Sequence, residues 1–190
     1  MEIRKAKIVD DLPQIALLIY NTDSYIYPYM FSGLNSWKDI LIDMIKTKGS
    51  LFYYENILIA IENNIIAGLI ISINEHTYLT KDYLKWQSIN KNLDFTIKNY
   101  ILPTIKHKLN STVYISNVCV NSDFRGQGIS KKLLKYLINN SKDNSFELDV
   151  LTDNIVAINL YKSYGFTITG EMKGFNAPYK RKPKVYNMKL

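Results

Sequence analysis

The stretch Asn121–Ser130, "NSDFRGQGIS", places two glycines, Gly126 and Gly128, between a strand-like run and a helix-like run. The preceding "TVYISNVCV" (112–120) is rich in β-branched residues, and the following "GISKKLLKYLINN" (128–140) has apolar residues at helical spacing. Glycine costs backbone entropy, so two of them at a helix start need a reason. Unpaired backbone N–H groups and the positive end of the helix dipole meet there. The stretch therefore predicts an anion site with a bare backbone.

The charges around the glycines favour the same interpretation. Lys131 and Lys132 stand in the first helical turn, where a cation opposes the dipole by about 0.3–1 kcal/mol. Arg125 adds a third positive charge, and a bound polyanion would offset the repulsion. Taken alone, the motif leaves open a plain glycine turn with lysines in water. A dinucleotide fingerprint is excluded because Lys131 replaces its third glycine, and a P-loop because Gly-Lys-Ser/Thr is missing.

The rest of the second half predicts a parallel strand pair and a hairpin. A strand at 146–152 follows the helix, so it must lie parallel to the strand at 112–120, with a right-handed crossover. Residues 154–166 predict a helix that Asn154 caps and Gly165 ends. The segments 166–175 and 184–190 close the chain as a hairpin.

The first half predicts an antiparallel region and two helices. Alternating apolar and polar residues at 2–9 are typical of an edge strand, and Pro13 near the first turn supports a helix. Two strands turn back at Asn63–Asn64, which tolerate left-handed backbone geometry. The predicted segments are an edge strand at 2–9, a helix at 10–20, an aromatic-rich loop at 24–35, a helix capped by Ser36 at 36–46 and a hairpin at 50–74.

Two motifs resemble the GNAT superfamily of N-acetyltransferases. "RGQGIS" between strand and helix is similar to the family's motif A, Arg/Gln-x-x-Gly-x-Gly/Ala, and "NIVAINLYKSYGF" is similar to its motif B, Asn-x-x-Ala-x-x-Leu-Tyr-x-x-x-Gly-Phe. The matching positions are Arg125, Gly128 and Ser130 in the first motif and Asn154, Ala157, Leu160, Tyr161, Gly165 and Phe166 in the second. Ser130 departs from the usual Gly or Ala but is still small.

The resemblance implies one domain over residues 1–190 with a mixed α/β fold. Its central, mostly antiparallel sheet would contain a parallel, splayed pair, the strands at 112–120 and 146–152, and helices would flank it. The motifs occupy only about 113–166. Residues 75–110 exceed the short connection usual in the family, and they predict a helical insertion.

The resemblance also implies acetyl-coenzyme A as co-substrate. Its pyrophosphate would lie on the amides of residues 125–131, its pantetheine arm would pair like a strand with the backbone of Val118 and Val120, and Asn154 could touch it or merely cap its helix. The implied binding residues are Val118, Cys119, Val120, Arg125, Gly126, Gln127, Gly128, Ile129, Ser130, Lys131, Asn154 and Tyr161.

Acetyl transfer to an amine needs an acid, an oxyanion donor and a neutral nucleophile. By resemblance, Tyr161 is the general acid that protonates the leaving thiolate; the alternative makes it a core aromatic. The backbone N–H of Cys119 or Val120 is the simplest oxyanion donor. Glu75 is the candidate base, Asp149 and Asp153 are rivals, and a water chain could replace all three, because a lysine-like amine is mostly protonated at neutral pH. We expect Cys119 itself to be a small buried hydrophobe rather than a nucleophile.

Composition indicates the cellular compartment and the kind of partner that we expect. One cysteine excludes an internal disulfide and suits a reducing cytoplasm, and with only His76 and His107 beside it we expect no metal. No signal-like N-terminus and no apolar run long enough for a bilayer appear, which argues against secretion and membrane insertion. The net charge of +7 favours an anionic partner.

Two alternative functions stay open at this level. One is a GNAT-like domain that binds an acyl-CoA without catalysis, as a sensor or scaffold. The presence of Tyr161, the general acid that the resemblance implies, argues against this alternative. The other is a nucleic-acid-binding module, whose expected basic helix or stacking motif is missing. The amine acceptor and the oligomeric state, including a homodimer, are not determined by the sequence.

Overall fold

The computed structural model describes residues 1–74, 88–89, 91–96, 112–141, 145–173 and 184–190. Its centre is a seven-stranded sheet in the order β1-β2-β3-β4-β5-β7-β6. Only the β4–β5 pair is parallel, so the predicted mixed sheet, antiparallel at both ends, is confirmed. The strands are β1 (Glu2–Lys5), β2 (Ile57–Glu62), β3 (Ile65–Ile73), β4 (Val113–Val120), β5 (Phe146–Leu151), β6 (Thr167–Lys173) and β7 (Lys184–Lys189).

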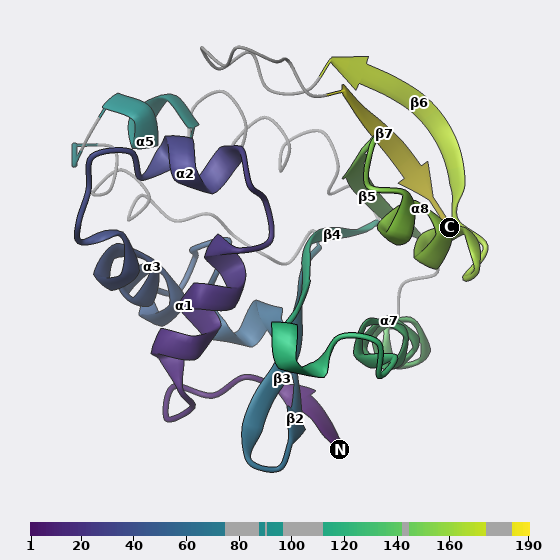
Figure 1. Ribbon diagram of the computed structural model, residues 1–190, viewed down its shortest axis with the longest axis horizontal. Coiled ribbons are helices and arrows are strands. Elements are labelled where there is room, and N and C mark those ends of the chain that lie inside the picture. The colour runs from purple at the N-terminus through teal and green to yellow at the C-terminus, as the bar shows by residue number, and fades with distance from the viewer. Residues whose placement is uncertain (75–87, 90, 97–111, 142–144, 174–183) are drawn as a thin grey trace.

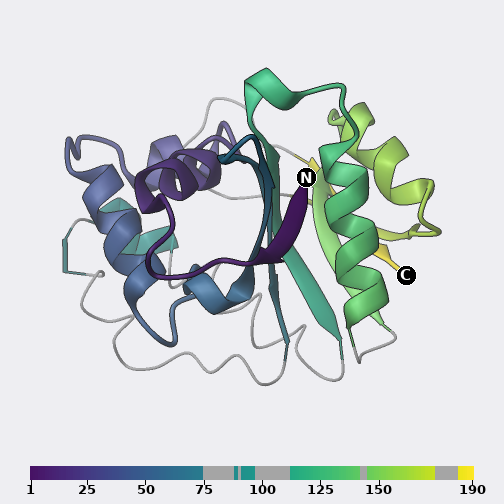
Figure 2. The ribbon, with the colours of Figure 1, turned by 90° about the horizontal axis from the view of Figure 1, so that it is seen from below.

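Helices cover both faces of this sheet (Figure 1). Figure 2, which views the sheet edge-on, shows α1, α2 and α3 on one side and α7 and α8 on the other. Each face carries its own apolar cluster, the first including Ile15 and Leu41 and the second Leu133 and Ile158. The described helices are α1 (Leu12–Tyr20), α2 (Ile26–Met30), α3 (Trp37–Lys46), α5 (Lys91–Thr96), α7 (Ile129–Asn140) and α8 (Ile155–Lys162).

Local sequence signals account for several element boundaries. Asn63 and Asn64 both have positive φ, +50° and +61°, and they join β2 to β3 in the predicted hairpin. The Asp11 carboxylate accepts from the Gln14 N–H and caps α1. Gly165, with φ +90°, follows the end of α8.

The aromatic segment 24–35 differs from the prediction, because it contains the short helix α2 rather than only a loop. The Asp23 carboxylate accepts hydrogen bonds from the backbone N–H groups of Tyr25 and Ile26, which organises the start of that turn. Pro28 is tolerated because a residue in the first helical turn has no intrahelical partner for its N–H group.

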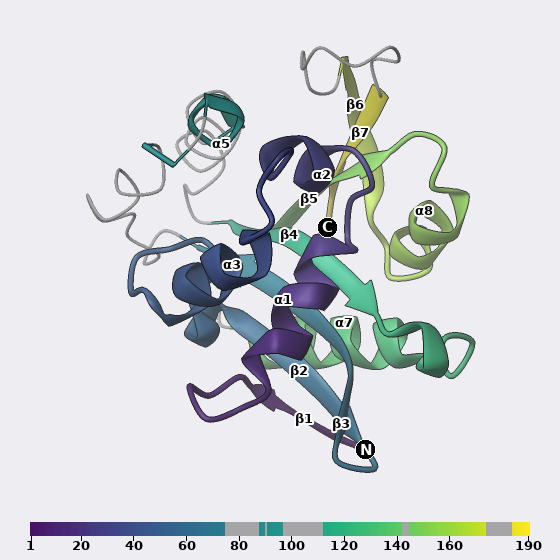
Figure 3. The ribbon, with the colours of Figure 1, turned by 60° about the vertical axis from the view of Figure 1, so that its left-hand side comes forward.

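A β-bulge at Ser116 separates β4 from β5. On β3, Ile71 pairs with Asn117 and the next residue, Ser72, pairs with Ile115, so Ser116 is the extra residue. The β4–β5 pairing contains three residue pairs and ends at Ile115. Beyond the bulge β4 diverges from the other half of the sheet, as Figure 3 shows. The predicted splayed pair is thereby confirmed, and its cause is the bulge.

The predicted insertion at 75–110 lies mostly outside the described residues, where only 88–89 and 91–96 are placed. Those placed residues include α5, which contributes buried Leu93 to the first apolar cluster. The turn of the closing hairpin also lies outside, although β6 and β7 pair antiparallel as predicted. None of the described helices combines the length and apolar character needed to cross a membrane.

Candidate functional site

The N-terminus of α7 is left bare by its sequence. Gly126 and Gly128 adopt positive φ, +79° and +72°, and a Cβ added to either would meet no atom of the described residues within 4 Å. Gly128 is the N-cap and offers no side chain to the first turn, whereas Asp11 caps α1 and Asn154 caps α8. The amides of this turn therefore face open space, in a helix of 12 residues.

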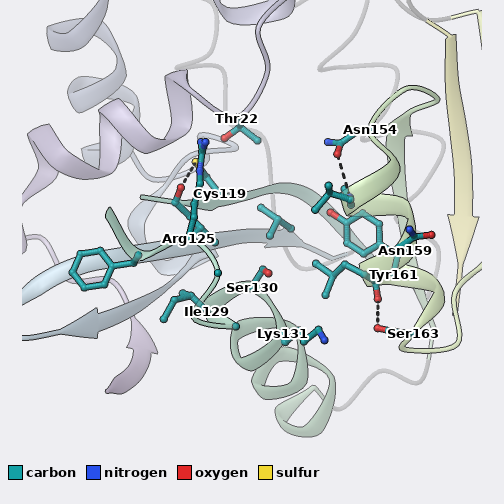
Figure 4. Close-up of a pocket in the computed structure, with 18 of the residues that line it drawn as sticks. Thr22, Cys119, Arg125, Ile129, Ser130, Lys131, Asn154, Asn159, Tyr161 and Ser163 are labelled. Carbon is teal, nitrogen blue, oxygen red and sulfur yellow. Dashed lines mark hydrogen bonds between the residues drawn. The ribbon is translucent and has the colours of Figure 1, made fainter. Parts of the chain in front are cut away.

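The surroundings of these amides are positive. Arg125, Lys131 and Lys132 form no ion pair with any residue that the structure describes, and the first turn of α7 contains no acidic residue. In Figure 4 the Arg125 side chain extends from the loop toward Thr22. Bare amides, a helix dipole and three cations make this end of α7 a suitable site for a pyrophosphate.

A cleft of about 690 Å³ opens at this helix end and continues between β4 and α8. Its volume is in the range of pockets that hold cofactor-sized ligands. Every residue of the sequence-predicted binding set lines it except Gln127, whose side-chain amide donates to the Asp123 carbonyl oxygen at 3.4 Å. The predicted residues that line it are Val118, Cys119, Val120, Arg125, Gly126, Gly128, Ile129, Ser130, Lys131, Asn154 and Tyr161.

The free edge of β4 presents backbone groups to the cleft. The Asn121 N–H donates to the Ala67 carbonyl oxygen of β3 at 2.9 Å, and strand N–H groups alternate in direction. The backbone N–H and C=O groups of Cys119 must therefore face β3 as well. In agreement, a Cβ added to Gly68 of β3 would lie only 2.8 Å from the Cys119 carbonyl oxygen. By the same alternation, the N–H and C=O groups of Val118 and Val120 point into the fork, the gap between the diverging ends of β4 and β5.

Cys119 is a buried free thiol, 8% exposed, as predicted. Burial raises its pKa, against smaller opposing effects of the Arg125 charge and the Thr22 hydroxyl. A raised pKa disfavours the thiolate, which is the nucleophilic form. The burial thus agrees with a packing role for the Cys119 side chain. Because the Cys119 N–H faces β3, the Val120 N–H is the one of the two that faces the cleft.

Tyr161 projects from α8 into the cleft, opposite β4 (Figure 4). Its side chain is 7% exposed and its ring packs on Phe166, with 5.8 Å between ring centroids. Burial raises the pKa of the phenol to about 12, so the hydroxyl stays protonated at neutral pH. Tyr161 is therefore a core aromatic that also lines the cleft with a protonated hydroxyl, so the two sequence interpretations are compatible and its role as general acid stays a prediction.

A second, smaller pocket of about 150 Å³ adjoins the cleft at the apex of the fork. Thr22, Val118, Asn154, Ala157 and Tyr161 line both cavities, so the two share a wall. The other residues of the smaller pocket come from the α1–α2 segment and from the paired ends of β4 and β5: Asp23, Ile26, Tyr27, Ile115, Ser116, Asn117, Asp149, Val150 and Leu151.

The three candidate bases are placed differently. Asp149 lines the smaller pocket. Asp153 is exposed at the start of α8 and lines neither cavity. Glu75 lies outside the described residues, so its role stays a prediction.

Sequence reasoning missed several residues of the two cavities. Thr22 stands at the end of α1, and Tyr27 on α2 receives a hydrogen bond from the Asn117 amide at 2.8 Å. Asn159 and Ser163 also line the cleft; they stand four residues apart, about one helical turn, and this spacing was the available signal that they share a face. For Thr22 and Tyr27 no such signal exists, because their position depends on how α1 and α2 pack.

Comparison with known proteins adds a family. A family model described as acetyltransferase (GNAT) family matches residues 18–166, which is most of the chain. The spermine/spermidine N(1)-acetyltransferase of Bacillus subtilis (strain 168) is 33% identical over 67 residues, covering 33% of this chain and 44% of that relative. The chain thus matches less than half of the length of this curated relative.

Two solved structures share the fold over the whole of this chain. An N-acetyltransferase from Staphylococcus aureus Mu50 is 24% identical, with a TM-score of 0.73, and covers 100% of both chains. A putative acetyltransferase from Salmonella typhimurium, solved with its cofactor acetyl-CoA, is 19% identical with a TM-score of 0.61 and covers 100% of this chain and 92% of that one. At these identities the likeness is one of fold.

Proposed function

This chain belongs to the acetyltransferase (GNAT) family, and from that premise we propose that it transfers an acetyl group from acetyl-CoA to a primary amine in a ternary complex. The observation that carries the proposal is the cleft itself. It joins a bare, positive helix N-terminus to a free strand edge and to a buried phenol that also reaches a second pocket.

The donor half of the cleft fits the chemistry of acetyl-CoA. The pyrophosphate would lie against the amides of Gly126 to Lys131, where a Cβ at either glycine would point into open space. The amides of the pantetheine arm would pair with Val118 and Val120, whose backbone groups point away from β3 and have no strand pairing with β5. Asn154 would combine helix capping with contact to the donor.

The chemical step requires this chain to supply two hydrogen bonds. When the neutral amine attacks the thioester carbonyl, a C–N bond forms and the carbonyl oxygen becomes an oxyanion, which the Val120 N–H would stabilise. The C–S bond then breaks, and Tyr161 would give its proton to the leaving sulfur. The nitrogen loses its extra proton to water or a base, and Tyr161 regains one from solvent, so the products are the amide and the free thiol of CoA.

The pKa of Tyr161 sets the limits of that role. A phenol near 12 is a weaker acid than a thiol near 8.5 in water, so full transfer is uphill there. Burial in the cleft would also raise the pKa of the CoA thiol, as it raises that of Cys119, and the pKa difference between this thiol and the Tyr161 phenol would become smaller. We infer a proton shared with the sulfur as the C–S bond breaks. A phenol placed in this way supports an enzyme over a sensor or scaffold.

The setting of the reaction is part of the same proposal. The lone thiol of Cys119 suits the reducing cytoplasm, where a cysteine stays free. The acid-lined second pocket and the cationic donor cleft both suit small charged substrates, which supports an amine acceptor over nucleic acid as the partner.

The proposal is tested by acetyl-CoA binding and by thiol release with amines. Acetyl-CoA at 100 times its dissociation constant should stabilise the protein by about 2.7 kcal/mol and raise the melting temperature. Gly128→Val should abolish that shift, because the new side chain occupies the space of the pyrophosphate. Gly33→Val is the matched control, since Gly33 has φ +76° and equally open surroundings away from the cleft.

The pair of variants separates strain from binding. Both should lose similar stability, of the order of 1–2 kcal/mol, from a side chain at positive φ. If Gly128→Val folds and binds acetyl-CoA as the wild type does, the glycines are only turn residues and the proposal fails.

A further inference from the structure

The donor cleft lies between two helices that the sheet does not hold together. α7 packs against β2, β3 and β4, whereas α8 follows β5 in the chain. β4 and β5 diverge beyond Ile115, so strand pairing does not fix the distance between the two helices at the cleft. On the proposed function that distance matters, because the first turn of α7 would contact the pyrophosphate of the donor and Tyr161 of α8 its thioester.

A tyrosine hydroxyl joins the two helices at this point. Tyr164 stands in the turn after α8, and its hydroxyl donates to the Lys131 carbonyl oxygen in the first turn of α7 at 2.8 Å. This length is typical of a well-formed O–H···O hydrogen bond. Among the residues that the structure describes, no other hydrogen bond links α7 to α8 or to the turn that follows it. Both helices also contribute to the second apolar cluster, but such packing is not directional.

The position of Tyr164 is itself fixed by local backbone bonds. Its N–H donates to the Tyr161 carbonyl oxygen at 2.9 Å, and the Phe166 N–H donates to the same oxygen at 3.2 Å. Gly165, between them, has φ +90° and lets the chain turn here. The Tyr164 ring packs against the second apolar cluster. A short path of hydrogen bonds therefore runs from the Tyr161 backbone, through Tyr164, to the first turn of α7.

Tyr164 can affect a donor only indirectly. It is not among the residues that line the cleft, although Lys131 and Ser163 beside it are. The second motif, Tyr-x-x-x-Gly-Phe at this point, leaves the position open, so the motif does not prescribe a hydroxyl here. A role for this hydroxyl therefore follows from its contact with Lys131 and not from the motif.

On the proposed function, we propose that Tyr164 is a positioning residue for the donor. Its hydroxyl holds the first turn of α7 at the distance from Tyr161 at which one acetyl-CoA contacts both. Without that hydroxyl the turn loses the contact, while Tyr161 stays packed on Phe166. A donor with a pyrophosphate then binds more weakly, but once bound it imposes the same distance, so the chemical step is unchanged.

The test compares Tyr164→Phe with the wild type, using acetyl-CoA and S-acetylpantetheine, a donor that lacks the pyrophosphate and the nucleotide. With acetyl-CoA we expect KM to rise about 3- to 10-fold, the value of one neutral hydrogen bond, with kcat nearly constant. With S-acetylpantetheine, kcat/KM by thiol release should be the same in both proteins, because this donor has no group that reaches the first turn of α7.

Tyr136→Phe is the matched control. Tyr136 lies on α7, it is half-buried as Tyr164 is, and its hydroxyl forms no hydrogen bond with any residue that the structure describes. The same chemical change at this position should leave the wild-type values with both donors.

A second measurement makes the result independent of turnover. Calorimetric binding of CoA should weaken by the same factor in Tyr164→Phe and should be unchanged in Tyr136→Phe. The melting curve of each variant without ligand checks that it is folded.

The two proposals fail in different ways. CoA binding that weakens in Tyr164→Phe, in a protein that acetylates no amine, supports the positioning role and overturns the proposed enzyme. Unchanged KM and CoA affinity in Tyr164→Phe overturn the positioning role alone. An equal loss with acetyl-CoA and S-acetylpantetheine, or a fall in kcat, also overturns it and assigns Tyr164 to packing around Tyr161. A wild-type protein that does not bind CoA overturns both proposals.

Discussion

At the scale of single residues, Tyr161 makes the sharpest prediction. Tyr161→Phe keeps the ring packed on Phe166 and removes only the hydroxyl that faces the cleft. Loss of a general acid costs about 10²–10⁴-fold in rate. Because the CoA thiol is a tolerable leaving group, we expect the lower end of that range, in kcat and with KM nearly constant.

Steady-state kinetics with wild type and Tyr161→Phe measure this directly. Acyl thioesters with more acidic thiols should partly rescue the variant, since their sulfur needs less protonation. A wild-type kcat in Tyr161→Phe would assign the residue to packing alone.

At the scale of elements, contact between β3 and β4 depends on the absence of a side chain at Gly68. A Cβ there would lie 2.8 Å from the Cys119 carbonyl oxygen and 3.1 Å from Ile129 Cγ2. We expect Gly68→Ala to lower the free energy of unfolding by about 1–3 kcal/mol, as overpacking does. It should also weaken acetyl-CoA binding, because β4 can relieve the clash only by moving toward the cleft.

Urea unfolding of Gly68→Ala and Gly170→Ala checks this. Gly170, on β6, has no atom of the residues that the structure describes within 4 Å of its Cβ position, so its substitution should change stability by less than about 0.5 kcal/mol. Equal stability of the two variants would show that β3 and β4 are not tightly packed at this point.

Elements also mark where sequence prediction succeeded. The Asn63–Asn64 turn and the Asn154 cap were predictable because their hydrogen bonds and dihedrals are local. The bulge at Ser116 was not, because "VYISNVCV" alternates regularly and the extra residue is defined only by its partner strand. The Tyr114–Asp149–Asn187 contacts join residues 35 and 38 positions apart, so no short motif could reveal them.

At the scale of the whole molecule, stability should depend on an acid-sensitive contact between β1 and the start of α1. Arg4 donates to both oxygens of Asp10, at 2.7 and 2.8 Å, and this bond, followed by the Lys7 backbone N–H, lowers the pKa of Asp10. A carboxyl whose pKa is lower in the folded state stabilises the protein above its unfolded value, near 3.9, and stops doing so as the pH falls through the folded value.

The free energy of unfolding should therefore fall as the pH drops below about 4, through protonation of Asp10 among other carboxyls. Asp10→Asn should be less stable at pH 7 and should lose less stability on acidification. Urea titrations of both proteins between neutral and acidic pH measure the difference. Parallel curves would mean that the Arg4–Asp10 pair contributes nothing to the pH dependence.

The one-residue bulge at Ser116 has a consequence for the order in which two substrates can bind. In the part of the sheet that the structure describes, β4 and β5 diverge at the fork, and the two cavities that meet there are lined by residues from helices on both faces. On the proposed function, the acetyl donor and the acceptor could then occupy the two cavities together, and neither would have to be released before the other binds. The order of binding would depend on their concentrations rather than on the geometry of the site. On the proposed function, substitutions in the α1–α2 segment could therefore change the acceptor, while the residues of α7 and α8 keep the same acetyl donor.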